Sequence, residues 1–353
     1  MCNKETLNKK HNPVLGIMKG IAILSVVAGH ALDNTVYESF VNQYHLATFF
    51  FVSGYFFQVR YVDDCKRFIA KRIKSLYIPF VVIMLLGIVF HNLLYDIYIN
   101  NAAYSFSEML TGGGNALLMN ASEQMLGAMW FCRPLFLISV MFCLFMKMMK
   151  TSKEYYRFAM IFTLAFVCYL WIYYKLPSPQ HIVHYMIIIP IFYMGYLFRK
   201  YEYYIPKKKI YKVLLMVMCL LVLVLFTKND ICAFLQPKHI ANASFGLIYL
   251  IGLTGCIMVY LMAGLLIDYK VGNILDICGN YSFSIMAFHF FGFKIVSAAM
   301  CLMEALSLSE IVAFPCMKYT SPLWFLLYCA GGIILPIILS KIYHQLVYKI
   351  SYV

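Results

Sequence analysis

The chain has 353 residues, of which 63% are hydrophobic and 12% charged, and its mean hydropathy is +0.77. Soluble globular domains are nearer half apolar and a quarter charged, so this composition excludes a soluble enzyme, a disordered chain and a disulfide-rich secreted module. The net charge is +14, with 29 Lys and Arg against 15 Asp and Glu. An outer-membrane barrel is disfavoured because its strands alternate apolar and polar residues.

The hydropathy pattern predicts an all-α, polytopic membrane protein with about ten transmembrane helices. A spanning helix needs about 20 apolar residues, and ten such stretches follow one another along the chain. They are residues 14–32, 43–60, 75–95, 126–146, 158–174, 183–198, 213–227, 241–266, 277–300 and 323–345. The polar stretches between them are too short for a soluble domain. Residues 1–353 are therefore expected to form one transmembrane domain, with residues 1–13 as a cytoplasmic tail.

The distribution of basic residues predicts the orientation of these spans. With the N-terminus inside, the inner segments carry 22 Lys and Arg and the outer segments carry four, while Lys19, Arg133 and Lys294 lie within spans. Cytoplasmic loops are enriched in Lys and Arg, so both termini are expected in the cytoplasm. The positive charge then reflects topology, and a nucleic-acid partner is not expected. The twelve Cys have no CxxC pair or metal-ligand spacing, so no metal site is predicted.

Two polar side chains share one face of the first span. Lys19 and His30 lie eleven positions apart in GIMKGIAILSVVAGH, which is within about 20° of three helical turns and about 16 Å along the axis. An ionisable residue inside the membrane is a candidate functional site because its burial is costly. Asp33, three residues further on, is placed to orient the imidazole. The alternatives are a Lys19 that snorkels to the inner interface and a structural role for His30.

The second span begins at about the same depth as His30. His45 lies there, and two histidines at one depth on adjacent helices predict a polar pocket, the alternative being an interfacial histidine. A basic cluster precedes the third span and ends with Arg72 and Lys74. Such a cluster either holds a polyphosphate ligand or sets the topology and contacts anionic lipid.

Later spans contribute further polar side chains. Arg133 follows Trp130 and precedes a proline inside the fourth span, and an Arg at this depth more often lines a cavity than faces lipid. The ninth span carries Asn280 and Ser282 in its inner half and His289 near the middle. Interhelical hydrogen bonds are the alternative role of Asn280 and Ser282.

These segments, in this order, resemble one protein family. KGIAILSVVAGH, QYHLATFFFVSGYFF and KRIKSLYIPF are similar to the membrane-bound acyltransferase-3 family, and WFCRPLF and GNYSFSIMAFH are similar to its later patterns. The resemblance covers almost the whole chain and is greatest for sugar O-acetylases of the fucose 4-O-acetylase type. It implies about ten spans in the bacterial cytoplasmic membrane. It also implies transfer of an acyl group, usually acetyl, from cytoplasmic acyl-CoA to a carbohydrate hydroxyl of the cell envelope.

The resemblance also implies roles for particular residues. The family signature is a basic residue, ten intervening residues and a histidine, and it maps onto Lys19 and His30, although many members have Arg at the first position. A basic-x-basic pair maps onto Arg72 and Lys74, which are expected to bind the donor together with Lys19. No tightly bound cofactor is implied, and acetyl-CoA is the co-substrate. The implied partners are the lipid bilayer and an acceptor that is a polysaccharide, a glycolipid or a lipid-linked sugar.

Acyl transfer to a hydroxyl needs a base and a donor that stabilises the oxyanion. His30 is the best base because an unperturbed imidazole titrates near neutrality, with Asp33 and His45 as the other catalytic candidates. Arg133 or His45 is the candidate oxyanion donor. Trp130, Arg133, Asn280, Ser282 and His289 are expected to support the pocket.

Three alternatives stay open. Both direct transfer and an acyl-histidine intermediate fit these residues. A secondary transporter of a sugar or lipid-linked intermediate would use the same His and Lys side chains as a proton relay, although the chain shows no inverted repeat of the kind common in transporters. An acyltransferase of another membrane family is the third alternative.

Overall fold

A computed structural model describes residues 12–32, 35–177, 182–206, 208–228, 244–319 and 321–350. Over this part of the chain the protein is helical and contains no strand. Nine helical stretches of the described residues are long and apolar enough to cross a membrane: Pro13–Ala31, Cys65–Val89, Gln124–Met148, Glu154–Tyr173, Ile182–Tyr204, Lys209–Lys228, Phe245–Leu266, Ser282–Met303 and Pro322–Gln345. The prediction of an all-α, polytopic membrane protein is confirmed.

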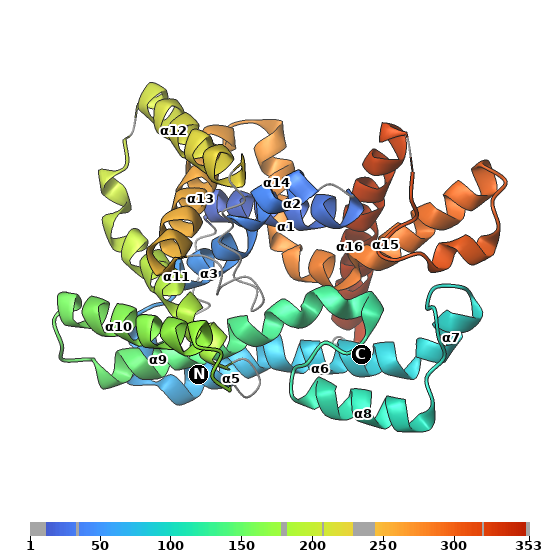
Figure 1. The fold of residues 1–353 in the computed structure, drawn as a ribbon, viewed down its shortest axis with the longest axis horizontal. Coiled ribbons are helices and arrows are strands. Elements are labelled where there is room, and N and C mark those ends of the chain that lie inside the picture. The colour runs from blue at the N-terminus through green and yellow to red at the C-terminus, as the bar shows by residue number, and fades with distance from the viewer. Residues whose placement is uncertain are drawn as a thin grey trace.

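The helices follow one another with short connections (Figure 1). They are α1 (Pro13–Ala31), α2 (Thr35–Asn42), α3 (His45–Tyr55), α4 (Arg60–Asp63), α5 (Cys65–Arg72), α6 (Ile78–Val89), α7 (His91–Asp96), α8 (Phe106–Leu117), α9 (Cys132–Met148), α10 (Glu154–Tyr173), α11 (Ile182–Tyr201), α12 (Lys209–Lys228), α13 (Phe245–Leu266), α14 (Lys270–Asn280), α15 (Ser282–Met303) and α16 (Pro322–Ile350). A π-helical turn, Ile73–Tyr77, joins α5 to α6, and a 3₁₀ helix, Gln124–Phe131, leads into α9.

The second predicted span, residues 43–60, is a shorter helix than the sequence indicates. Helix α3 has 11 residues, which is about 16 Å of helix against a hydrocarbon core of about 30 Å. It is packed between α1, α11 and α13. Because the helix is enclosed by protein, its polar backbone ends are shielded from contact with lipid.

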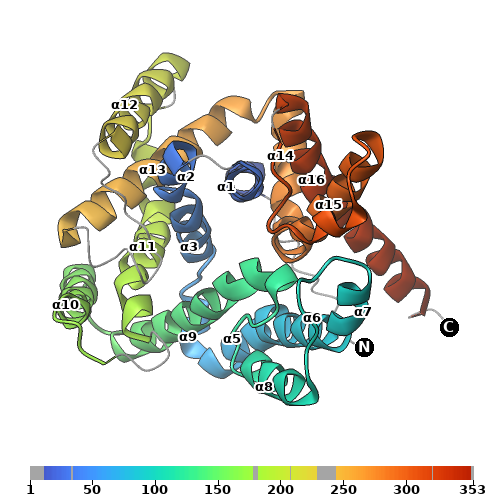
Figure 2. The same ribbon diagram turned by 45° about the vertical axis from the view of Figure 1, so that its right-hand side comes forward.

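Helix α1 lies near the centre of the bundle and is seen almost end-on in Figure 2. It packs on α14, α3, α13, α16 and α15. The contact with α14 is so close that a Cβ on Gly279 would lie 1.9 Å from the carbonyl oxygen of Gly16, and one on Gly20 would lie 2.0 Å from that of Leu275. Glycine is therefore required at this crossing, which fixes α1 and the side chains that it carries.

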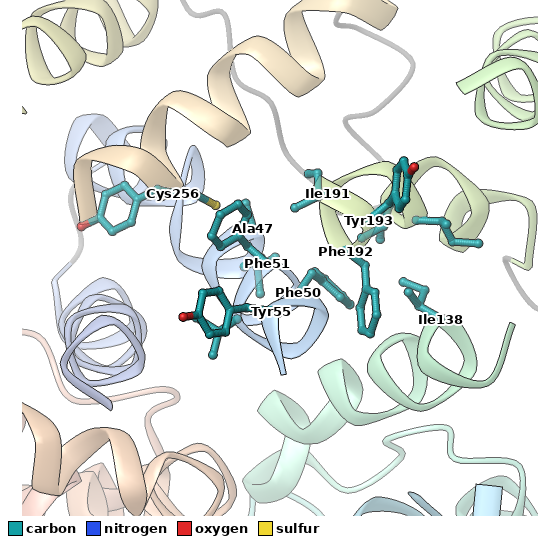
Figure 3. Packing of buried hydrophobic residues seen from close by; sticks show 14 of the residues in the cluster. Ala47, Phe50, Phe51, Tyr55, Ile138, Ile191, Phe192, Tyr193 and Cys256 are labelled. Atoms are coloured by element: carbon teal, nitrogen blue, oxygen red, sulfur yellow. The ribbon is translucent and has the colours of Figure 1, made fainter. Parts of the chain in front are cut away.

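Aromatic side chains pack α3 against α9 and α11 (Figure 3). Phe50 and Phe192 are almost completely buried and lie beside Ile138 of α9. The Phe192 ring lies 4.9 Å from that of Phe142, measured between ring centroids. This cluster holds α3, and with it the start of the helix at His45, against the rest of the bundle.

The segment between the third and fourth predicted spans folds back along the third. Helix α8 begins with a capping box between Ser105 and Glu108 and then runs antiparallel to α6. Its Gly112 faces Ile88, whereas Leu117, at its far end, accepts a hydrogen bond of 3.0 Å from the Tyr77 hydroxyl. The hydropathy pattern predicts that this segment is an outer loop, but its helix α8 packs beside α6.

A second segment that the sequence predicts to be outside, residues 308–319, contacts the C-terminal end of α1, and we call it the strap. Lys294, inside α15, donates hydrogen bonds of 2.7 Å to the carbonyl oxygens of both Ile311 and Ala313. The Tyr319 hydroxyl donates to the carbonyl oxygen of Ala31. The strap therefore joins α15 to the last turn of α1, where His30 lies.

Candidate active site

A cavity of about 90 Å³ lies at the C-terminal end of α1 and is bounded by α1, α2, α3, the 3₁₀ helix Gln124–Phe131 and α15. A water molecule takes up roughly 30 Å³ of liquid, so the cavity has room for a few waters or a short acyl group. Polar and apolar side chains both line it. The polar and indole side chains are Ser25, His30, Glu38, Asn42, His45 and Trp130.

His30 is the most accessible of the histidines that the sequence places in this region. It lies in the last turn of α1, and its ring faces the cavity. On its other side the ring stacks on His289, with 5.4 Å between centroids and 17° between planes, and it lies 5.1 Å from the Phe290 ring. One face of the His30 imidazole is thus open to a ligand, while the other is packed.

The two neighbouring histidines have defined tautomers. His289 is completely buried, and its Nδ1 lies 2.9 Å from the carbonyl oxygen of Ile285. His45 is buried too, and its Nδ1 lies 2.7 Å from the carbonyl oxygen of Val41. A carbonyl oxygen can only accept, so each Nδ1 carries the hydrogen and each neutral ring keeps a lone pair on Nε2. The Nε2 of His289 has no hydrogen-bond partner in the described part of the chain.

Side-chain hydrogen bonds fix the turn between α2 and α3. The Tyr44 hydroxyl lies 2.8 Å from that of Ser25 on α1. The Gln43 side-chain amide donates to the Thr227 hydroxyl on α12 at 2.7 Å. These contacts position His45 on the cavity wall opposite α1, as the shared depth of the two histidines predicts.

The predicted donor-binding residues are not assembled around His30. Lys19 is half-buried on α1, three turns from His30 towards the N-terminal end of the helix. Arg72 and Lys74 lie on α5 and the π-helical turn, which pack on α9 and α6 rather than on α1. The Arg72 guanidinium lies 5.3 Å from the centre of the Phe68 ring, and Lys74 is exposed. Asp33 lies outside the described residues.

The other predicted supporting residues separate into two groups. Trp130 lines the cavity and His289 backs His30. Arg133 is buried nearby but donates to the side-chain oxygen of Asn120, and it is not among the described side chains that line the cavity. Asn280 is exposed and donates to Asp276 of its own helix at 3.4 Å, and Ser282, half-buried at the start of α15, is likewise away from the cavity lining.

Sequence reasoning missed Ser25, Glu38 and Asn42. Glu38 and Asn42 lie in the first outer connection, where polar residues are ordinary and carry no signal. The spacing of Glu38, Asn42 and His45 by four and three positions is that of one helical face, but the turn between α2 and α3 interrupts the helix and obscures the pattern.

A second cavity, of about 290 Å³, lies at the opposite end of α1. Its lining includes Val14 in the first turn of α1, Glu202, Lys212 and Tyr260. Glu202 also accepts a hydrogen bond of 2.8 Å from the Tyr55 hydroxyl. In the described ranges, no three His, Cys, Asp or Glu side chains lie close enough to hold a metal ion.

The fold and the site define a multi-pass membrane protein with a small, histidine-lined cavity at the end of its central helix. Residues 12–341 match a family model described as an acyltransferase domain, and the chain belongs to this acyltransferase-3 family. The family resemblance drawn from the sequence is therefore confirmed, as is an acyltransferase activity in general terms. No curated protein and no solved structure matches the chain.

Proposed function

We propose that this protein transfers acetyl from cytoplasmic acyl-CoA to a hydroxyl of a cell-surface or lipid-linked carbohydrate, in the manner of the fucose 4-O-acetylase type. The observation that carries the proposal is the placement of His30, whose ring faces a cavity of about 90 Å³ at the end of the central helix. A cavity of this size favours a short acyl group over a long one.

In the proposed reaction, the side chain of His30 takes the proton of the acceptor hydroxyl. The hydroxyl oxygen attacks the carbonyl carbon of the thioester, and the carbonyl electron pair moves to its oxygen. When the pair returns, the carbon–sulfur bond breaks and the CoA thiolate leaves and takes the proton from His30. We assign His45, whose Nε2 holds a lone pair, to hold the acceptor hydroxyl, and we keep the role of orienting the His30 ring that the sequence predicts for Asp33.

Donor binding from the cytoplasm is supported by the arrangement along α1. Lys19 precedes His30 by three turns, about 16 Å, and the second cavity lies at the inner end of the same helix beside Lys212. Lys19, Arg72 and Lys74 are proposed to bind the CoA phosphates, while the extended thiol arm reaches His30. Acetyl-CoA would act as a co-substrate, with no tightly bound cofactor.

The polar lining of the cavity fits a carbohydrate acceptor. Glu38 offers a carboxylate to sugar hydroxyls, and Trp130 supplies a flat apolar surface on the same cavity. We place the protein in the bacterial cytoplasmic membrane, with a polysaccharide, a glycolipid or a lipid-linked sugar as acceptor and no nucleic-acid partner.

The test is release of free CoA from acetyl-CoA by the purified protein in detergent, with and without a cell-envelope glycan extract. Wild type would be compared with His30→Ala and with His344→Ala, a matched control because His344 is exposed near the far end of α16. We expect glycan-dependent release from wild type and His344→Ala and none from His30→Ala. Near-normal release from a folded His30→Ala protein would contradict the catalytic assignment. No release by a folded wild type would favour the transporter alternative and a flux assay.

A further inference from the structure

All but one of the polar side chains in the turn that joins α2 to α3 make a hydrogen bond that holds the turn in place. Gln43 donates to Thr227, Tyr44 bonds Ser25, and the Nδ1 of His45 bonds the carbonyl oxygen of Val41. Asn42 is the last residue of α2 and belongs to the same turn. Its neighbours fix the backbone on both sides, so the position of the Asn42 side chain does not depend on a hydrogen bond of its own.

The Asn42 amide is buried and incompletely satisfied. The side chain is only 6% exposed, it lines the cavity beside His30, and its amide nitrogen has no hydrogen-bond partner among the residues that the structure describes. Buried donors are almost always hydrogen-bonded in native proteins, and exceptions mark strain, catalysis or a missing ligand. A leucine of nearly the same size would fill this position without leaving a donor unpaired, so the amide needs a functional explanation.

Acyl transfer needs a hydrogen-bond donor at the carbonyl oxygen, and each of the other candidates fits this place less well than Asn42. The Nδ1 hydrogen of His45 is committed to Val41, which leaves the neutral ring no second N–H. Arg133 donates to Asn120, away from the cavity lining. Trp130 has an indole N–H, but its side chain is only half-buried. Asn42 combines burial, an unpaired N–H and a place on the cavity wall.

We propose that the side-chain amide of Asn42 donates a hydrogen bond to the acyl carbonyl oxygen and stabilises the oxyanion formed when the acceptor attacks. This rests on the proposed acyl transfer. As the carbonyl π electrons move onto oxygen, the Asn42 N–H gains an anionic partner, and it loses that partner when the electrons return and the thiolate leaves. A donor that is held in position before the reaction is the arrangement that stabilises a transition state most strongly.

The test combines kinetics with stability. In Asn42→Leu the amide is replaced by an apolar side chain of similar size, so we expect kcat to fall by about 10²–10³-fold, as for loss of an oxyanion donor. The KM values for acetyl-CoA and acceptor should stay close to wild type, and the Tm should equal or exceed wild type because a buried unpaired donor has been removed. Asn42→Asp, which places an acceptor against the oxyanion, should be at least as inactive.

Gln43→Leu is the matched control in the same turn. It breaks the hydrogen bond to Thr227, so its Tm should fall while its kcat changes less than that of Asn42→Leu. A lower Tm with unchanged kcat in Asn42→Leu would show that the amide is structural and overturn the proposal. A raised acceptor KM with normal kcat, or loss of kcat in Trp130→Phe but not in Asn42→Leu, would also overturn it. His30→Ala is run alongside, because absence of His30-dependent transfer in wild type would refute the proposed function itself.

Discussion

The packing role and the hydrogen-bonding role of His289, the histidine behind His30, can be separated by mutation. His289 is completely buried, its Nδ1–H is held by Ile285, and its Nε2 is an unpaired acceptor next to the His30 ring. Because the rings stack and this Nε2 makes no hydrogen bond to His30, we expect His289 to support the His30 ring by packing on its face.

His289→Phe keeps the ring and removes the acceptor, whereas His289→Gln keeps an acceptor and removes the ring. We expect the Phe variant to keep most of its kcat because the stacked ring is retained, and the Gln variant to lose more activity and to unfold at a lower temperature because the packing of a buried ring is lost. Steady-state kinetics and thermal unfolding in detergent would check both. The reverse order, with Gln active and Phe inactive, would mean that a hydrogen bond from this side chain is needed.

Glu123 forms a separate buried polar cluster outside the spanning helices. It lies 2.8 Å from His91, whose other ring nitrogen lies 2.9 Å from the carbonyl oxygen of Ala102 and whose ring stacks on Tyr104. Burial raises the pKa of the Glu123 carboxyl above its usual range, although His91 and backbone N–H groups lower it in part. The folded protein therefore binds this proton more tightly than the unfolded chain.

The raised pKa of Glu123 gives the pH dependence a definite sign. The contribution of Glu123 to the free energy of unfolding is fully present below the pKa of this carboxyl in the unfolded chain, about 4.3. It is lost as pH rises through the pKa of the carboxyl in the folded protein. Glu123→Gln does not titrate, so we expect the Tm of wild type to decline relative to the variant from about pH 4 upwards. Thermal unfolding in detergent across pH 4–8 would measure it. Parallel curves of Tm against pH, or a Tm of wild type that rises relative to that of the variant with increasing pH, would contradict this expectation.

At the scale of single helices, the crossing of α1 and α14 determines where the site lies. We expect Gly279→Ala to destabilise the protein by about 1–3 kcal/mol, because the new methyl would overlap the backbone of α1 and force the helices apart. Activity should fall with stability, since His30 is carried by α1. Gly246→Ala is the control: it lies in α13 with open space around it and should leave the Tm unchanged or raise it. Equal Tm values for the two variants would show that the crossing can relax.

Helices were predictable because hydropathy is a local property. Eight of the predicted spans have ends close to those observed. The third begins earlier than predicted, at Cys65, because α5 and the π-helical turn extend it. Helix α3 was not foreseen as a short one, since its length depends on the helices that enclose it. The antiparallel packing of α8 on α6 also depends on tertiary contacts, so the hydropathy pattern does not predict it.

Part of the site was predictable for the same reason. His30 and His45 flank a turn at one depth, so their shared cavity follows from the connection between them. The distance between the basic pair at Arg72 and Lys74 and helix α1 depends on how the helices are arranged, which spacing along the chain does not encode. Asn42 was missed because the turn between α2 and α3 places an ordinary loop residue in the cavity wall.

At the scale of the whole molecule, orientation in the membrane is the first property to measure. The inner segments hold 22 Lys and Arg against four in the outer ones, so we expect a C-terminal green fluorescent protein fusion to fluoresce and a C-terminal alkaline phosphatase fusion to be inactive. A phosphatase fused after Tyr104, in the predicted outer segment, should be active. The opposite pattern would invert the protein and place the His30 cavity on the cytoplasmic side.

The bundle has a centre and a periphery. In the most apolar window of α1, 61% of residues are buried, against 17% in those of α10 and α12, which lie at the edge of the molecule in Figure 1. Most side chains of α10 and α12 are thus required only to be apolar, whereas most positions of α1 must also fit their neighbours. In evolutionary terms, we expect α10 and α12 to drift in sequence and to adapt to membranes of different thickness, and we expect α1 and its glycine crossing to change much less.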